Sequence, residues 1–348
     1  MWHTLGQDRI VKLFQDSVKR RAMAHAYLLV GPPHVGKMRL AIDMAKALNC
    51  TGAEQPCDNC SACQRIEQGK HTDVMVIDKY AGRDAKDRKR ATEIGISAIR
   101  ELLQRSANLP PYEGKHKVYI IDDADIMSVE ASNCLLKTLE EPPPNVLIIL
   151  LTAEESLLLP TVISRCQKME LKPVTTGEIE SRLAGMNNLS PEKIKLLARL
   201  SGGCLGWAML AAGNDVYVNE RESRLVEFIP LITSNWDARL SYAQQVATER
   251  SGAEQVIKLW LLWCRDVMLI KYNCEDEITN LDHKDDIKNW ANMLTVLEIK
   301  DFIENLNKAL INLTYNANLH LLFEVLMLDM PRKEKRAEYM MHSAGLNQ

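Results

Sequence analysis

Long apolar runs are absent from this sequence of 348 residues, and aromatic residues make up only 5% of it. The longest apolar run, 146–151, is far shorter than the roughly 18 residues that a membrane-spanning helix needs. The opening residues, MWHTLGQDRIVK, lack the apolar centre of a secretory signal peptide. These absences predict a protein without a membrane span, located in the cytoplasm.

An excess of basic charge is also missing, because 43 Lys and Arg residues face 46 Asp and Glu residues. A protein that coats nucleic acid by itself usually carries the opposite balance. Any contact with DNA is therefore expected from a local patch or from an assembly. The frequent Leu, Ala, Lys and Glu residues favour helices.

Apolar runs alternate with helical patterns in the first half of the chain. Strands are expected at 26–30, 74–77, 118–121 and 146–151, with helices at 7–20, 37–48, 94–107 and 129–139 between them. Such alternation predicts a parallel sheet with helices on both faces. The polar segment 80–90 is expected to be a loop. After Pro173 only helical patterns follow, so the domains are predicted at 1–172, 173–213 and 214–335, with a tail at 336–348.

A glycine-rich loop follows the first predicted strand. Gly31, Gly36 and Lys37 have the spacing of a phosphate loop, in which backbone N–H groups, a lysine and a helix N-terminus hold phosphate oxygens. The motif requires Ser or Thr after the lysine to bind Mg²⁺, but this chain has Met38, whose thioether is a poor ligand for a hard cation. The loop predicts a degenerate nucleotide site; a tight turn that only resembles the motif is the alternative.

Acidic residues end the predicted strand 118–121. Beside a phosphate loop, Asp122 has the place of an aspartate that holds Mg²⁺. Asp123 stands where a longer glutamate would polarise the attacking water. Because acids at strand ends are also common in turns, this pattern gains weight only together with the loop.

Four cysteines, Cys50, Cys57, Cys60 and Cys63, lie within fourteen residues. In a chain expected in the reducing cytosol, this spacing is typical of a tetrahedral structural Zn²⁺ site at 50–63. Four thiolates close the coordination sphere, so no water-activating role follows. An iron–sulfur site and chance clustering are the alternatives.

Several short motifs together resemble the AAA+ clamp loaders of bacterial DNA polymerase III. They are the run from Asn133 to Pro143, the triplet Ser164-Arg165-Cys166, the segment 25–28 before the phosphate loop and the segment 71–74 after the cysteines. The cysteine insert after the phosphate-loop helix is another feature of this family. The resemblance is close over about 5–210 and looser beyond, where it rests mainly on 316–319 and the last apolar helix.

The resemblance implies an α/β AAA+ phosphate-loop domain with an inserted zinc module, followed by a small helical lid and an all-α collar. Arg165 would then be an arginine finger that reaches the ATP site of a neighbouring subunit; a structural arginine that caps its own helix is the alternative. Thr152 occupies the place of a nucleotide-sensing residue. Lys37 either binds phosphate or only holds the loop.

The implied partners are the motor ATPase subunits and the delta subunit in a hetero-pentamer, which loads the sliding clamp on primer-template DNA. Arg100 and Arg105 are candidate contacts to DNA phosphates, although a solvated helix face also explains them.

Three departures distinguish this chain from the motor subunits of that family. Met38 replaces the hydroxyl that binds Mg²⁺, Trp207 follows Gly206 where motor subunits carry a nucleotide-sensing arginine, and no long tail follows the collar. They favour a scaffold that donates Arg165 and has little or no ATPase activity. A catalytically active motor-type ATPase is the first alternative. An adaptor outside replication with a redox-sensitive cysteine cluster is the second.

Overall fold

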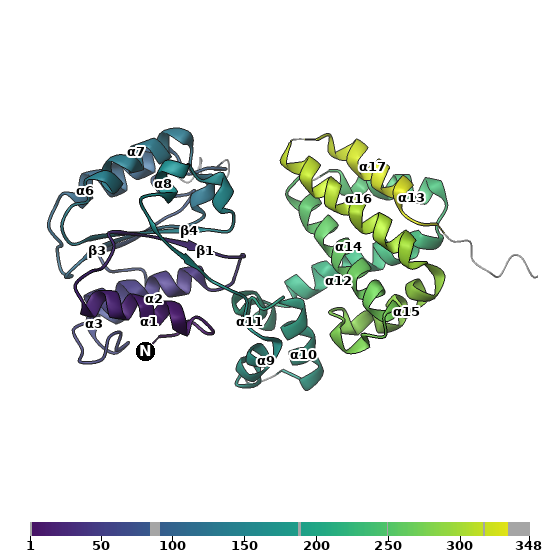
Figure 1. Cartoon of the computed structure of the whole chain (residues 1–348), viewed down its shortest axis with the longest axis horizontal. Coiled ribbons are helices and arrows are strands. Elements are labelled where there is room, and N and C mark those ends of the chain that lie inside the picture. Colours follow the sequence, from purple (N-terminus) through teal and green to yellow (C-terminus); the bar gives the residue numbers. More distant parts are fainter. Residues whose placement is uncertain (1, 84–90, 187–188, 249, 316, 333–348) are drawn as a thin grey trace, which may run out of the picture. The chain divides into compact units, whose positions relative to one another are not determined.

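The computed structural model describes residues 2–83, 91–186, 189–248, 250–315 and 317–332 (Figure 1). The chain divides into two compact units. Unit 1 comprises Met1–Arg182 and Ser201–Met209, and unit 2 comprises Leu183–Leu200 and Leu210–Gln348. The division into three domains remains a prediction. The predicted tail 336–348, most of the predicted loop 80–90, and Asn316 lie outside the described residues.

A wholly parallel sheet of five strands forms the centre of unit 1. The strands lie in the order β2-β3-β4-β1-β5 and comprise β1 (Ala26–Val30), β2 (Val74–Ile77), β3 (Lys117–Ile121), β4 (Val146–Thr152) and β5 (Gln167–Glu170). The sequence predicted the first four from their apolar runs, which are typical of strands buried on both faces. The edge strand β5 escaped prediction because only Met169 of its four residues is buried.

Helices cover both faces of this sheet (Figure 1). On one face, α1 (Asp8–Lys19) and α2 (Lys37–Asn49) share a core with the strand residues Tyr27 and Leu29. On the other face, Leu28, which lies between Tyr27 and Leu29, joins a second core. This alternation follows the two-residue period of a strand. The second core is closed by α5 (Ile96–Ala98), the π-helical turn η1 (Ile99–Gln104), α6 (Arg105–Ala107), α7 (Val129–Glu140) and α8 (Pro160–Ile163).

Short elements complete the first half of the chain and lead out of it. They are α3 (Ser61–Glu67), the 3₁₀ turns η2 (Ala124–Ile126) and η3 (Glu155–Leu157), and the helices α9 (Thr176–Ala184), α10 (Pro191–Leu200) and α11 (Leu205–Gly213). The last three are the short helices that the sequence predicted after Pro173.

Unit 2 is helical beyond residue 210, as the sequence predicted. Besides α10, its elements are α12 (Val216–Phe228), η4 (Ile229–Thr233), α13 (Trp236–Val246), α14 (Arg250–Lys271), η5 (Glu275–Glu277), η6 (Leu281–His283), α15 (Lys284–Met293), α16 (Val296–Thr314) and α17 (Leu319–Asp329). Trp260 and Trp263 of α14 are fully buried, and the ring of Phe228 stacks on that of Trp260 with 4.8 Å between centroids. The apolar stripe of α14 is therefore core. Among the described helices, none is both long enough and apolar enough to span a bilayer.

Candidate functional site

The phosphate loop joins β1 to α2, the strand–loop–helix context that the motif requires. Gly36 precedes α2 with φ 109°, a conformation that favours glycine. A Cβ atom at Gly31 would lie 2.7 Å from the carbonyl oxygen of Leu171, so no side chain fits there. Both glycines are thus required by the backbone itself.

Lys37 is buried and points back into its own loop. Its Nζ donates to the carbonyl oxygens of Gly31, at 2.6 Å, and of Pro32, at 3.0 Å. Met38 packs against the core beneath α2, where a thioether is an ordinary apolar group. Met38 therefore contributes to packing and offers no hydroxyl for a metal ion.

Acidic side chains and Thr152 meet the loop at the same edge of the sheet. Val30 pairs with Thr152 in register, and Ile121, before Asp122, pairs with Leu150. Parallel strands of this kind place their ligand sites at the carboxyl ends. The sequence-predicted residues of the nucleotide site thus converge.

The electrostatics of this edge reflect that convergence. Burial lowers the pKa of Lys37, although the carboxylates of Asp123, Asp122 and Asp125 act in the opposite direction. Burial and the adjacent Asp123 raise the pKa of Asp122. The Oγ1 of buried Thr152 donates to the Oδ1 of Asp125 at 2.7 Å. Asp125 is a member of this group that sequence reasoning missed.

Gly206, at the start of α11, closes over the phosphate loop. Its N–H donates to the carbonyl oxygen of His34 at 3.0 Å, and a Cβ atom there would lie 2.6 Å from the same oxygen. Only glycine permits this approach. The sequence had marked Gly206 only for its neighbour Trp207, since nothing local signals the contact.

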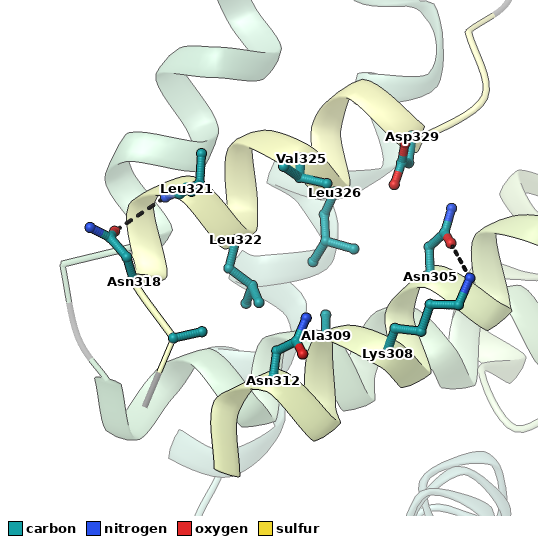
Figure 2. Close-up of a pocket in the computed structure, with 11 residues that line it drawn as sticks. Asn305, Lys308, Ala309, Asn312, Asn318, Leu321, Leu322, Val325, Leu326 and Asp329 are labelled. Carbon is teal, nitrogen blue, oxygen red and sulfur yellow. Dashed lines mark hydrogen bonds between the residues drawn. The ribbon is translucent and has the colours of Figure 1, made fainter. Parts of the chain in front are cut away.

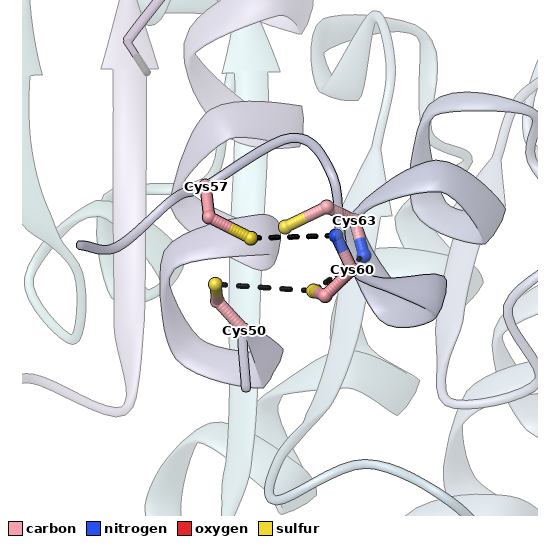
Figure 3. A group of neighbouring side chains, drawn as sticks. All are labelled: Cys50, Cys57, Cys60 and Cys63. Carbon is pink, nitrogen blue, oxygen red and sulfur yellow. Dashed lines mark hydrogen bonds between the residues drawn. The ribbon is translucent and has the colours of Figure 1, made fainter. Parts of the chain in front are cut away.

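The four cysteine side chains gather at the end of α2 and in the loop and helix that follow (Figure 3). One sulfur atom from each of them lies within 4.8 Å of all the others. Backbone N–H groups of Gly52, Cys60 and Cys63 donate to sulfurs of the cluster at 3.3–3.5 Å. Backbone hydrogen bonds from Thr51 and Cys63 outweigh the effect of burial and lower the pKa of Cys60. Four convergent sulfurs with N–H···S support have the donor chemistry that Zn²⁺ prefers.

Charged side chains attach this cysteine module to the phosphate-loop helix. Lys46 of α2 is buried and its Nζ lies 2.9 Å from Asp58 and 2.5 Å from Glu67. Arg39 of the same helix pairs with Glu67 at 2.7 Å and with Asp43 at 2.9 Å. The module and α2 are therefore held as one body.

Arg165 follows α8 and is half-buried. Its Nη1 donates to the carbonyl oxygen of Thr161 at 2.9 Å, and its Nη2 lies 2.8 Å from Oε1 of Glu140. The contact with Thr161 is the helix-capping contact that the alternative interpretation expected. The guanidinium nevertheless remains accessible, since 35% of the Arg165 side chain is exposed. The adjacent Cys166 is partly buried, and desolvation of its thiol raises its pKa to about 12.

Two further concave surfaces have distinct chemistry. In unit 1, a cavity of about 480 Å³ is lined by Arg100, Arg105 and Lys137 together with polar residues and one acid, Glu141. In unit 2, a groove of about 300 Å³ between α16 and α17 combines leucines with Asn and Lys side chains (Figure 2).

Comparison with known proteins agrees with these features. Residues 6–175 match the family described as DNA polymerase III, delta subunit. DNA polymerase III subunit delta′ of Bacillus subtilis is 30% identical over 92% of this chain and 95% of its own length. The tau subunits of Bacillus subtilis and Escherichia coli are 36% and 34% identical over 51% and 58% of this chain, but each match covers only 30% of the tau subunit. The near full-length match decides the assignment: the chain belongs to the delta′ family of DNA polymerase III clamp-loader subunits.

Proposed function

We propose that this chain is the stationary subunit of a clamp loader and donates Arg165 to the ATP site of a neighbouring motor subunit. The observation that supports this proposal is the contrast between Arg165 and the chain's own phosphate loop. The accessible guanidinium of Arg165 lies at the surface, whereas Lys37 of the chain's own loop donates to loop carbonyls and Met38 is partly buried against the core. A site without a metal-binding hydroxyl is poorly suited to Mg²⁺-dependent hydrolysis.

In this role Arg165 stabilises the charge that develops on the transferring phosphoryl group. The partners are the motor subunits and the delta subunit of a pentamer, which together load the sliding clamp on primed DNA. Relatives named tau and delta′ support these partners.

A contact to the DNA backbone is proposed for the cavity around Arg100, Arg105 and Lys137. Three cations gather there on one surface of a chain whose net charge is −3. Phosphate contacts need such clusters of Lys and Arg.

The proposed subunit interface uses the outer face of α17 in unit 2. Leu321, Val325 and Leu328 are 60%, 44% and 56% exposed, at helical spacing, while Leu322 and Leu326 fill the core. A second apolar stripe on a helix whose first stripe is already buried indicates a partner surface.

The cysteine cluster is proposed to hold one structural Zn²⁺ through Cys50, Cys57, Cys60 and Cys63. The metal, when bound, would cross-link the end of α2 to the loop and α3. The charged contacts of Lys46 and Arg39 would pass that constraint to the phosphate-loop helix.

The test is Arg165→Ala in a clamp loader reconstituted with its cellular partners. We expect the assembly to form, and its ATP hydrolysis and clamp loading to fall by up to about a thousandfold, as arginine fingers supply gains of this order. Unchanged rates in a correctly assembled complex would refute the finger role.

A motor-type ATPase is the second candidate, because Lys37, Asp122 and Thr152 do converge on one edge of the sheet. Mg²⁺-dependent ATP turnover by the isolated chain, at a rate that Lys37→Met abolishes, would favour this candidate over the stationary role.

A further inference from the structure

Arg165 has a carboxylate partner within its own chain, contributed by another element. Glu140 is the last residue of α7, and its Oε1 lies 2.8 Å from Nη2 of Arg165. The other terminal nitrogen, Nη1, donates to the carbonyl oxygen of Thr161 at 2.9 Å and has a longer contact of 3.5 Å with Oγ of Ser164. The guanidinium is thus held by α7 through Glu140 and by α8 through Thr161.

The two groups that contact Arg165, Glu140 and the carbonyl of Thr161, which we call its anchors, lie at helix ends that prolines delimit. Three prolines, residues 142–144, follow α7 and prevent the helix from continuing past Glu140 and Glu141. The helix α8 begins at Pro160, whose fixed φ suits a first helical position. Buried Leu139 and Val162, one residue from each anchor, belong to the same core and fix the spacing of the two helices.

The contacts that Arg165 makes within the described part of the chain do not use all of its donors. Arginine has five N–H donors in a planar fork. The two of Nη1 face Thr161 and Ser164, and one of Nη2 faces Glu140. Among the described residues, no partner takes the N–H of Nε or the second N–H of Nη2. Free N–H groups of a guanidinium can donate to the oxygens of a phosphate.

We propose that Glu140 is a positioning residue for Arg165. This inference rests on the proposed role of Arg165 as a finger. A free arginine side chain loses much rotamer freedom when it is fixed in one place. Glu140 and Thr161 hold the group before the neighbouring ATP site arrives, so part of that loss is already incurred in the free subunit. Preorganisation of this kind acts on the transition state.

Folding stability does not explain the pair. Both side chains are partly exposed, at 50% for Glu140 and 35% for Arg165. Ion pairs in such positions contribute little to the stability of a fold. A positioning role therefore predicts an effect on the rate constant for ATP hydrolysis rather than on the unfolding temperature.

The experiment is a double-mutant cycle in the reconstituted clamp loader, with steady-state ATP hydrolysis as the readout. Glu140→Ala should lower kcat by about two- to fivefold, the range expected for losing a partly exposed ion pair, while KM for ATP changes less. Glu140→Gln, which keeps an acceptor oxygen, should lose less. In an Arg165→Ala background, Glu140→Ala should have no further effect on kcat, because a positioning residue acts only through Arg165. A purely structural role of Glu140 would instead persist in that background.

Glu130→Gln is the matched control, since it removes one charge from the exposed first turn of the same helix. A higher kcat for Glu140→Ala would show that the carboxylate restrains the finger instead of positioning it, and an equal loss in the Arg165→Ala background would show a structural role. Either result would overturn the proposal. If Arg165→Ala itself had no effect, the finger role would fail first, independently of Glu140.

Discussion

The ammonium nitrogen of Lys37 lies 2.6 Å from the carbonyl oxygen of Gly31, six residues earlier in the same loop. In a loop that binds nucleotide, the same nitrogen is needed at the β- and γ-phosphates. The loop carbonyls satisfy the charge internally, and the carboxylates of Asp123 and Asp122 lie close enough to stabilise it further. The lysine thus has a structural use that does not depend on any ligand.

Lys37→Met tests whether Lys37 has only this structural role or also supports ATP hydrolysis. Because hydrolysis in the proposed assembly occurs at other subunits, we expect the ATPase rate of the complex to stay within about twofold of wild type. Removing a buried charge together with its hydrogen bonds should change the free energy of unfolding by only about 1 kcal/mol. A tenfold fall in the rate of the intact complex would contradict the stationary role and indicate hydrolysis at this site.

The sequence predicted those parts of the fold and site that depend on local spacing. The phosphate loop, the strand-end acids and the four cysteines are each contained in a short segment, and each lies in the predicted structural context. The contact between Gly206 and His34 and the pair of Glu140 with Arg165 join distant segments, so no local pattern could reveal them. Tertiary packing alone determines such pairs.

Removal of the metal site should weaken unit 1 and leave unit 2 unaffected. We expect about one Zn²⁺ per purified chain, lost in Cys60→Ser because three thiolates bind the ion far less tightly. Since metal binding at such sites contributes directly to folding, unit 1 should unfold at least about 5 °C lower. Metal analysis and calorimetry measure both effects.

Cys274→Ser is the control for that experiment, because this exposed cysteine lies in unit 2. It should keep its zinc and its unfolding temperature. Iron in place of zinc would show that the proposed metal is wrong, and full zinc content in Cys60→Ser would show that the proposed ligand set is wrong.

His283 should make unit 2 more stable in acid than in base. Burial by itself would lower the pKa of His283, but hydrogen bonds from its ring to Glu222, at 2.8 Å, and Asp286, at 3.1 Å, outweigh burial and raise it. The nearby Asp282 adds to the attraction and is itself paired with Arg221. The folded state therefore binds this proton more tightly than the unfolded state.

The sign of the pH dependence follows from that difference in pKa. The contribution of His283 is complete below its ordinary value of 6.5 and is lost as the pH rises through the raised value. The stability difference between wild type and His283→Gln should thus be constant below about pH 6 and shrink above about pH 6.5. Chemical denaturation across this range measures it, with the half-exposed His320→Gln as a control. A difference that grows with pH would contradict the proposed charged state.

Arg239 shows how a residue without any sequence signal can dominate local stability. It lies in α13, within a polar stretch that gave no reason to expect burial, yet its side chain is fully buried. Its guanidinium donates to backbone carbonyls, among them Leu231 at 2.9 Å, Met330 at 2.7 Å and Pro331 at 2.8 Å. These carbonyls terminate η4 and α17, where the negative ends of helix dipoles favour a cation.

Arg239→Met should therefore be among the most destabilising single changes in unit 2. It leaves several buried carbonyl oxygens without a donor, and we expect a loss of about 3–5 kcal/mol in the free energy of unfolding. Arg239→Lys, with three donors in place of five, should lose less. Arg224→Met is the matched control, since its surface pair with Glu220 contributes only about 0.5 kcal/mol.

Burial lowers the pKa of Arg239 to about 10, so the group stays charged near neutrality and these losses should vary little between pH 6 and 8. A loss below about 1 kcal/mol for Arg239→Met would mean that water reaches the carbonyls, and that the end of α17 does not depend on this arginine.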